Sequence, residues 1–133
     1  MASDEVKSDR RYTKDHEWAQ AHEGNVRIGI TAFAVDQLGD ITLVNLDVKA
    51  GDQLTVGKAF GTIESVKTLS DLFTPVSGKV ASVNPAVIDR AELVNDDCYG
   101  AAWIIEITPS DAKELESLLD HVAYADFIKT AGH

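Results

Sequence analysis

The apolar residues of this chain occur in short runs that turn-forming glycine, proline and asparagine residues separate. Within the runs, apolar and other side chains alternate with the two-residue period of a half-buried strand. The clearest runs are Val26–Ile30, Ile41–Leu46, Gln53–Val56, Ala59–Val66, Asp71–Thr74, Lys79–Val83 and Trp103–Ile107. Turn signals at intervals of roughly 8–12 residues are typical of sandwiches and barrels. We therefore expect a mostly β fold of short antiparallel strands, in a compact sandwich or barrel.

Three segments carry helix signals instead. Thr31 is a residue type preferred at a helix N-cap, so we expect a short helix over Ala32–Leu38 that ends at the following glycine. The pair Asn84–Pro85 predicts a second helical turn, because proline suits the first helical position. Pro109–Ser110 is expected to open a C-terminal helix that covers one side of the fold, since apolar residues recur there at helical spacing. These residues are Leu115, Leu118, Leu119 and Val122.

The charge balance excludes some classes of partner. Lys and Arg number 12 against 22 Asp and Glu, which gives a net charge of −10 at pH 7. Nucleic-acid binding needs a clustered basic surface, and an anionic membrane would repel this chain, so we expect neither partner. No apolar run approaches the roughly 20 residues of a membrane span. A chain of 133 residues forms one domain with little room for a separate lid or cofactor domain, so we expect a module that serves other proteins.

The sequence contains no pattern of an enzyme or a metal centre. The four histidines form no i, i+4 pair, and none lies at ligand spacing from the single cysteine, Cys98, so we expect no metal site. A Gly-x-Ser-x-Gly elbow and a phosphate-binding loop are both missing from the sequence. A single cysteine also allows no intramolecular disulfide. We therefore expect the chain to have no catalytic residues of its own.

The N-terminal segment bears on the cellular compartment. Met1–Lys7 has no apolar stretch typical of a signal peptide, and its acidic residues argue against a transit peptide. Residues 1–10 are polar and are expected to be loosely ordered. The expected compartment is the bacterial cytoplasm, with the mitochondrial matrix after leader removal as the alternative.

One lysine stands between two β-rich runs. If Ala59–Val66 pairs antiparallel with the run that begins near Asp71, Lys67 lies at or near a hairpin tip. Small residues surround it, and the carboxylates of Glu64 and Asp71 lie on either side. A tip lysine is exposed, flexible and free of competing contacts, which suits a side chain that an enzyme must acylate. A lysine at a hairpin tip can also serve only to keep the protein soluble. The position of Lys67 therefore does not decide between an acylated lysine and an ordinary surface lysine.

The sequence around this lysine resembles a known family. The stretch Gly61–Val83 resembles the swinging-arm hairpin of lipoyl and biotinyl domains, and Glu64-Ser65-Val66-Lys67 resembles the H proteins of the glycine cleavage system in particular. Biotinyl domains flank their lysine with methionines, which Val66 and Thr68 do not match. Further matching segments are Tyr12–Trp18, Gly29–Thr31, Leu38–Ile41, Leu93–Asn95, Tyr99–Gly100 and Trp103, so that the resemblance extends from about Tyr12 to Phe127. Departures from the family pattern fall in turns and loops, at Asp47, Ala91, Cys98 and Ala102.

The resemblance implies a fold, a cofactor and a set of partners. The fold would be a flattened lipoyl/biotinyl-type barrel-sandwich hybrid, with residues 11–133 as a single lipoyl-carrier domain. Lys67 would carry lipoate through an amide bond. The chain would not be an enzyme but would shuttle the aminomethyl group of decarboxylated glycine between three of them. These are glycine decarboxylase (P protein, which uses pyridoxal phosphate), the tetrahydrofolate-dependent aminomethyltransferase (T protein) and dihydrolipoyl dehydrogenase (L protein).

Other residues of the family-like segments are candidates for recognising or sheltering the arm. The loaded arm would carry a cationic amine, and we hypothesise that Glu17 and Asp71 face an apolar cleft that holds it. Glu64, with its neighbours Ser65 and Val66, is a candidate for recognition by the lipoate-attaching enzyme, which would be a fourth partner. We expect His16 and Trp18 to be packing residues of the N-terminal part of the fold rather than catalytic residues. We also expect the carrier to be a monomer.

Three alternatives remain open at the level of the sequence. The chain could be a lipoyl domain of a 2-oxoacid dehydrogenase, although such domains are usually shorter and commonly have Asp rather than Val before the lysine. It could instead relay lipoate to other proteins. A third alternative, from another class, is an unmodified interaction module that kept the fold. A soluble hydrolase is a remote option that no group of residues supports.

Overall fold

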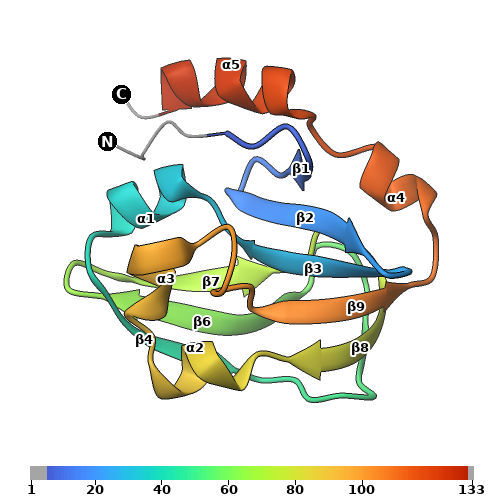
Figure 1. The fold of residues 1–133 in the computed structure, drawn as a ribbon, viewed down its shortest axis with the longest axis horizontal. Coiled ribbons are helices and arrows are strands. Elements are labelled where there is room, and N and C mark those ends of the chain that lie inside the picture. The colour runs from blue at the N-terminus through green and yellow to red at the C-terminus, as the bar shows by residue number, and fades with distance from the viewer. Residues whose placement is uncertain (1–5, 132–133) are drawn as a thin grey trace.

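The computed structural model describes residues 6–131, which form two antiparallel β-sheets with helices around them (Figure 1). The larger sheet has six strands in the order β1-β2-β3-β9-β8-β5, and the smaller has three in the order β4-β6-β7. The strands are β1 (Arg11–Tyr12), β2 (Glu17–His22), β3 (Asn25–Ile30), β4 (Ile41–Leu46), β5 (Gln53–Leu54), β6 (Ala59–Ser65), β7 (Leu69–Phe73), β8 (Gly78–Val83) and β9 (Ile105–Pro109). The helices are α1 (Ala32–Leu38), α2 (Pro85–Asp89), α3 (Leu93–Asp97), α4 (Lys113–Glu116) and α5 (His121–Ala131).

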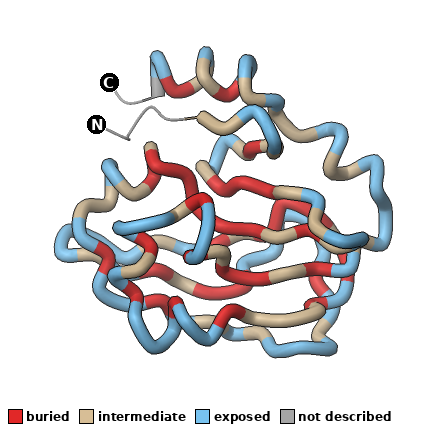
Figure 2. Tube along the Cα trace, in the orientation of Figure 1, coloured by how far each residue is buried: buried red, intermediate tan, exposed pale blue. Residues whose placement is uncertain are grey.

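One apolar cluster fills the space between the two sheets. Ile28 and Ile107 of the larger sheet and Val44, Ile63 and Leu72 of the smaller sheet all belong to it and are buried. Buried residues follow the strands through the centre of the molecule, whereas most turns at the surface are exposed (Figure 2). This arrangement follows from the alternation in the sequence, because successive side chains of a strand point to opposite faces. The prediction of a mostly β, sandwich-like fold of short antiparallel strands is confirmed.

The predicted capping residues act as expected. The Thr31 hydroxyl accepts a hydrogen bond from the Ala34 amide at 3.1 Å at the start of α1. Gly39 ends this helix with φ at +81°, and its amide donates to the Val35 carbonyl at 3.0 Å. At the start of α2, the Asn84 side chain accepts from the amide two residues later. Local sequence therefore determines both helix starts, as capping rules predict.

Two strands near the N-terminus, after residue 10, were not predicted from the sequence. The pair β1 and β2 adds two strands to the larger sheet. The loose order was expected for residues 1–10. Residues 1–5 lie outside the described part of the chain, so the structure describes only residues 6–10 of this segment. Within these, the Arg10 guanidinium lies over the ring of Trp18 at 4.6 Å and that of Tyr99 at 5.2 Å, and it donates to the Tyr99 carbonyl at 2.8 Å. These contacts attach the end of this segment to the fold.

The C-terminal helix differs from the prediction in where it begins. Pro109 still belongs to β9, and the helical region is divided into α4 and α5. The division has a physical reason: the amide and carbonyl of Leu119 both pair with Tyr12 of β1, at 2.9 and 2.8 Å, which removes them from a continuous helix. The buried face of α5 is formed by Tyr124 and Ile128, while Val122 is 58% exposed. In Figure 1, α5 lies along one side of the molecule, next to β1. No helix in residues 6–131 is long and apolar enough to cross a membrane.

Candidate functional site

Lys67 lies at the tip of a hairpin, as the sequence predicted. Strands β6 and β7 pair antiparallel, with Glu64 opposite Leu69 as the last pair before the turn. The second strand begins at Leu69 rather than near Asp71, so only Val66–Thr68 connect the two strands. The tip is therefore a tight turn rather than a long loop.

Hydrogen bonds hold the backbone of this turn on both sides of the lysine. The Ser65 hydroxyl oxygen accepts from the amides of Lys67 and Thr68, each at 3.1 Å, and the Ser65 amide donates to the Thr68 carbonyl at 2.9 Å. From outside the hairpin, the carbonyl of Asp40 accepts from the Val66 amide at 3.0 Å. Ser65 and Val66, both candidates for recognition, thus stabilise the turn by hydrogen bonds. Ser65 does so through its hydroxyl oxygen, and Val66 does so through its backbone amide. The backbone at the tip, which was expected to be flexible, is therefore held by hydrogen bonds.

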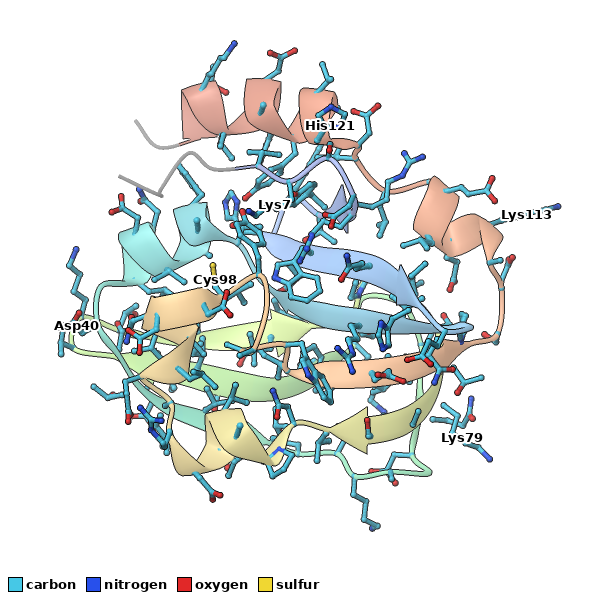
Figure 3. The ribbon with its side chains drawn as sticks, viewed as in Figure 1. Lys7, Asp40, Lys79, Cys98, Lys113 and His121 are labelled. Atoms are coloured by element: carbon cyan, nitrogen blue, oxygen red, sulfur yellow. The ribbon has the colours of Figure 1, made fainter. Side chains whose placement is uncertain are left out.

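The Lys67 side chain is exposed, and within residues 6–131 its ammonium forms no ion pair. Its stem lies against Gly39, where an added Cβ would come within 3.4 Å of Cε and 3.5 Å of Cδ. Figure 3 labels the neighbouring Asp40 at one end of the molecule and Lys79 and Lys113 toward the opposite end. The lysine amine is therefore accessible and is separated from these other lysines.

A cleft of about 270 Å³ opens beside this hairpin. Its walls come from α1, from the N-terminal part of β7 and from the turn before β2. Leu38 lies in one wall, directly before Gly39, and Ser70 lies in the other wall, just after the hairpin turn. Both walls therefore lead back to Lys67. The lining residues are Asp15, His16, Glu17, Ile30, Phe33, Ala34, Gln37, Leu38, Ile63, Ser70, Asp71 and Leu72.

Glu17 and Asp71 both line this cleft, although they are far apart in the sequence. Glu17 is only 2% exposed. One of its carboxyl oxygens accepts from the Thr13 hydroxyl at 3.0 Å and the other from the Phe73 amide at 3.2 Å. The second bond joins β2 to β7 and thereby connects the two sheets. Asp71, by contrast, is exposed on the edge strand at the rim of the cleft.

Burial gives Glu17 unusual acid–base behaviour. Loss of water raises the pKa of this carboxyl to about 8, even though the hydrogen bonds from Phe73 and Thr13 oppose the shift. At neutral pH the carboxyl therefore holds a proton while the cleft is empty. An ammonium group that entered the cleft would favour the ionised form, because an opposite charge nearby lowers the pKa of a carboxyl.

His16 is a cleft residue that sequence reasoning assigned only to packing. Its Nδ1 lies 2.8 Å from the Tyr124 hydroxyl, which also lies 2.8 Å from the Thr31 hydroxyl. Its ring contacts Phe33, and burial lowers the pKa of the imidazole, which favours the neutral form at pH 7. The prediction that the histidine packs is consistent with these contacts, but it also forms part of the wall. Trp18, as predicted, is buried in the fold.

Glu64 lies outside the cleft, on the exposed face of the smaller sheet. Within residues 6–131 its carboxylate forms no ion pair or side-chain hydrogen bond. No group of His, Cys, Asp and Glu among the described residues could hold a metal ion. The candidate site residues thus fall into three places. Glu17 and Asp71 line the cleft. Glu64 lies on the exposed face of the smaller sheet beside the hairpin turn, and the turn itself contains Ser65, Val66 and Lys67.

A two-layer β fold that presents an exposed lysine on a tight hairpin next to a cleft defines a carrier domain of the lipoyl and biotinyl class. The comparisons with known proteins specify the member of that class. The chain belongs to the glycine cleavage H-protein family, whose model matches residues 10–131.

The relatives agree over nearly the whole chain. The chain is 50% identical over 121 residues to a glycine cleavage system H protein from Oceanobacillus iheyensis, covering 91% of this chain and 95% of the relative. It is 48% identical over 125 residues to one from Symbiobacterium thermophilum, covering 93% and 96%. Among solved structures, the crystal structure of a glycine cleavage system H protein from Mycobacterium marinum matches with a TM-score of 0.83 and 35% identity, covering 96% of this chain and all of the other.

Membership of this family establishes the general function. H proteins are the lipoyl carriers of the glycine cleavage system, and they transport a group between enzymes without catalysing a reaction themselves. The prediction of a carrier rather than an enzyme is confirmed.

Proposed function

We propose that Lys67 carries lipoate as an amide and that residues 11–133 act as one lipoyl-carrier domain of the glycine cleavage system. The observation that carries the proposal is the exposed lysine amine, without an ion-pair partner in residues 6–131, on a hydrogen-bonded turn beside the carboxyl-lined cleft. When attached, lipoate supplies a dithiolane that undergoes thiol–disulfide chemistry. The residues fit such a group, because the lysine side chain is exposed and the cleft is lined by Leu38 and Ser70, which lie close to the hairpin turn.

The proposal includes partners and a compartment. Glycine decarboxylase, the aminomethyltransferase and dihydrolipoyl dehydrogenase would bind the carrier in turn, and a lipoate-attaching enzyme would modify it first. A tethered arm presents its end at a high effective concentration to whichever enzyme is docked, so a monomer suffices. The relatives come from bacteria, which favours the bacterial cytoplasm.

Peptide mapping after lipoylation in vitro tests the attachment site. We expect the purified chain, incubated with a lipoate-attaching enzyme, lipoate and ATP, to gain one lipoyl group, and mass spectrometry to locate it on Lys67. The exposed lysines Lys58 and Lys79 serve as internal controls and should stay unmodified, because neither stands at the tip of the β6–β7 hairpin. Modification at either of them, or no modification at all, would contradict the proposal.

We further propose that the cleft holds the cationic amine at the end of the loaded arm. Apolar walls from Phe33 and Leu38 exclude water, and the carboxyl of Glu17 lies at a site where an ammonium group can draw it into the ionised form. A charge-assisted hydrogen bond in such a site contributes about 1.5–3 kcal/mol. Asp71 at the rim adds a second negative charge. The arrangement would slow the loss of the cargo to water.

The lifetime of the loaded carrier tests this role of the cleft. We expect Glu17→Gln to shorten the lifetime about tenfold at pH 8, which corresponds to about 1.4 kcal/mol. The pKa of Glu17 is about 8 in the empty cleft, and the bound ammonium group lowers it, so that the ionised form predominates in the loaded carrier at pH 8. The ratio of wild-type to Glu17→Gln lifetimes should therefore fall as the pH is lowered from 8 and the carboxyl is protonated. Quantifying ammonia and formaldehyde release provides the measurement.

Two further variants complete that experiment. Asp71→Asn removes the rim charge without disturbing a buried group and should shorten the lifetime by a smaller factor. Asp126→Asn changes a carboxylate on the exposed face of α5 and should leave the lifetime unchanged. Thermal unfolding of each variant separates a lost contact from a lost fold. Equal lifetimes for the wild type, Glu17→Gln and Asp71→Asn would refute the role of the cleft.

A further inference from the structure

Side-chain hydrogen bonds connect the C-terminal helix to the wall of the cleft. The hydroxyl of Tyr124, on α5, lies 2.8 Å from the Thr31 hydroxyl and 2.8 Å from His16 Nδ1. Thr31 and Tyr124 are fully buried, whereas His16 is half-buried and lines the cleft. We call these three residues the Thr31–Tyr124–His16 triad. Because Tyr124 does not line the cleft itself, it can influence a bound group only through the histidine.

The hydrogen atoms of the triad can be assigned from its acceptors. The Thr31 oxygen already accepts from the Ala34 amide at 3.1 Å, and within residues 6–131 the Tyr124 oxygen is the acceptor in reach of the Thr31 hydrogen. A buried hydroxyl that donates to nothing costs free energy, so Thr31 donates to Tyr124. Tyr124 then donates its own hydrogen to His16 Nδ1. A nitrogen that accepts carries no proton, so the neutral imidazole has its proton on Nε2.

This arrangement opposes a positive charge on His16. Protonation would place a hydrogen on Nδ1, directly against the hydrogen that Tyr124 donates. To avoid this clash the Tyr124 hydroxyl would have to turn toward Thr31, and the Thr31 hydrogen would lose its acceptor. A hydrogen bond to the neutral form of a group disfavours its charged form. Burial acts in the same direction and lowers the pKa of His16.

Acidic residues around the imidazole act against the triad. Asp15 precedes His16 in the sequence and raises its pKa, and Glu17 and Asp71 line the same cleft. Negative charges favour the imidazolium form, so Asp71 and an ionised Glu17 would promote a positive charge on the cleft wall. The triad and burial therefore counteract an effect of the same carboxylates that suit a cationic cargo.

The helices packed against His16 present uncharged groups to it. Helix α1 contacts the imidazole through Phe33, at 4.8 Å between ring centroids, and its residues along the cleft are uncharged. Helix α5 contacts it through Tyr124 and Phe127. The exposed Lys14 ammonium lies 6.0 Å from the Phe127 ring, and water weakens its effect on the imidazole. Within residues 6–131, the bond from Tyr124 is thus the hydrogen bond that keeps Nδ1 free of a proton.

We propose that Tyr124 is a positioning residue that keeps His16 uncharged, so that the cleft accepts a cationic cargo without repelling it. The inference rests on the proposed attachment at Lys67 and on the proposed binding of the loaded amine in the cleft. An imidazolium group in the wall would repel the ammonium group, whereas a neutral ring does not. The C-terminal helix, which contributes no lining residue, thereby controls the charge of the cleft wall.

Titration of the unmodified carrier by NMR tests the triad directly. We expect the ¹⁵N resonances of His16 at pH 8 to show a proton on Nε2 and none on Nδ1. Tyr124→Phe removes the donor but keeps the ring that stacks on Tyr12, so the pKa of His16 should rise. Tyr12→Phe is the matched control, because its buried hydroxyl bonds to Lys7, and it should leave that pKa unchanged. An unchanged pKa in Tyr124→Phe would overturn the inference.

The lifetime of the loaded carrier tests the consequence for the cargo. Relative to the wild type, Tyr124→Phe should keep the lifetime at pH 8 and shorten it about threefold at pH 6, as expected for two like charges in a water-filled cleft. His16→Asn cannot become charged, and asparagine tolerates the φ of +68° at this position. Adding Tyr124→Phe to His16→Asn should therefore shorten the lifetime no further at pH 6.

The combined variant separates a charge effect from a loosened fold. A threefold loss that persists in the His16→Asn background would overturn the inference, because Tyr124 would then not act through the imidazole. An equal loss at pH 6 and pH 8 would also overturn it. Thermal unfolding at both pH values verifies that each variant is folded. Absence of a lipoyl group on Lys67 in the wild type would instead contradict the proposed function, and the titration of the unmodified carrier would still test the triad.

Discussion

Replacing Lys67 with arginine is expected to abolish carrier activity completely. Arginine preserves the positive charge and most of the length of the side chain, so the turn held by Ser65 and Asp40 should remain. Its guanidinium stays protonated at all accessible pH values and does not act as a nucleophile toward an activated acyl group. No lipoyl amide can therefore form at this position.

The measurement is glycine cleavage reconstituted with the three partner enzymes and lipoylated carrier. Lys67→Arg should give the rate of a mixture without carrier, and intact mass should detect no lipoyl group. Lys79→Arg, whose position lies toward the opposite end of the molecule in Figure 3, should retain full activity. A fully active Lys67→Arg protein would refute the assignment of the arm to this lysine.

The second large effect is expected at Gly61, in the strand that leads to the hairpin. Gly61 is buried between Leu46 of β4 and Leu72 of β7. A Cβ at this position would lie 2.4 Å from the Asn45 carbonyl oxygen, a backbone atom that cannot move without displacing its strand. Gly61→Ala should therefore reduce the free energy of unfolding by about 3 kcal/mol, at the upper end of what overpacking costs. For a chain of this size the melting temperature should fall by roughly 10 °C.

Gly24 supplies the matched control for this effect. It has φ at +86°, and nothing lies within 4 Å of an added Cβ. Gly24→Ala therefore has a conformational cost of about 1 kcal/mol and no steric cost. Thermal and urea unfolding followed by circular dichroism compare the two variants. If Gly61→Ala were no less stable than Gly24→Ala, the close approach of β4 and β6 would not be a constraint on the fold.

The features that local sequence rules predicted are those set by local interactions. Thr31 and Asn84 cap their helices because the cap bond forms within three residues. The hairpin around Lys67 follows from alternation on both sides of a short polar segment. These elements required no knowledge of the tertiary structure.

The features that sequence reasoning missed depend on distant partners. The strand β2 begins at Glu17, a residue type that is almost never fully buried unless paired, and its partners Thr13 and Phe73 become visible only in the folded chain. The break between α4 and α5 arises from pairing of Leu119 with Tyr12, which no helical periodicity reveals. The short helix α3 was also not anticipated. By contrast, the resemblance to the family did place Glu17 and Asp71 near one cleft. Their distance from each other in the sequence gives no indication that they lie close together in the fold.

The bond between the Asp40 carbonyl and the Val66 amide has a consequence for engineering. A synthetic peptide that covers only residues 59–73 would contain the lysine and both strands but would lack the corner after α1 that supports the turn. The same is true of a hairpin transplanted into a foreign scaffold. A minimal acceptor tag built from this protein therefore has to include both the corner around Gly39 and the hairpin, as two discontinuous pieces held at a fixed spacing.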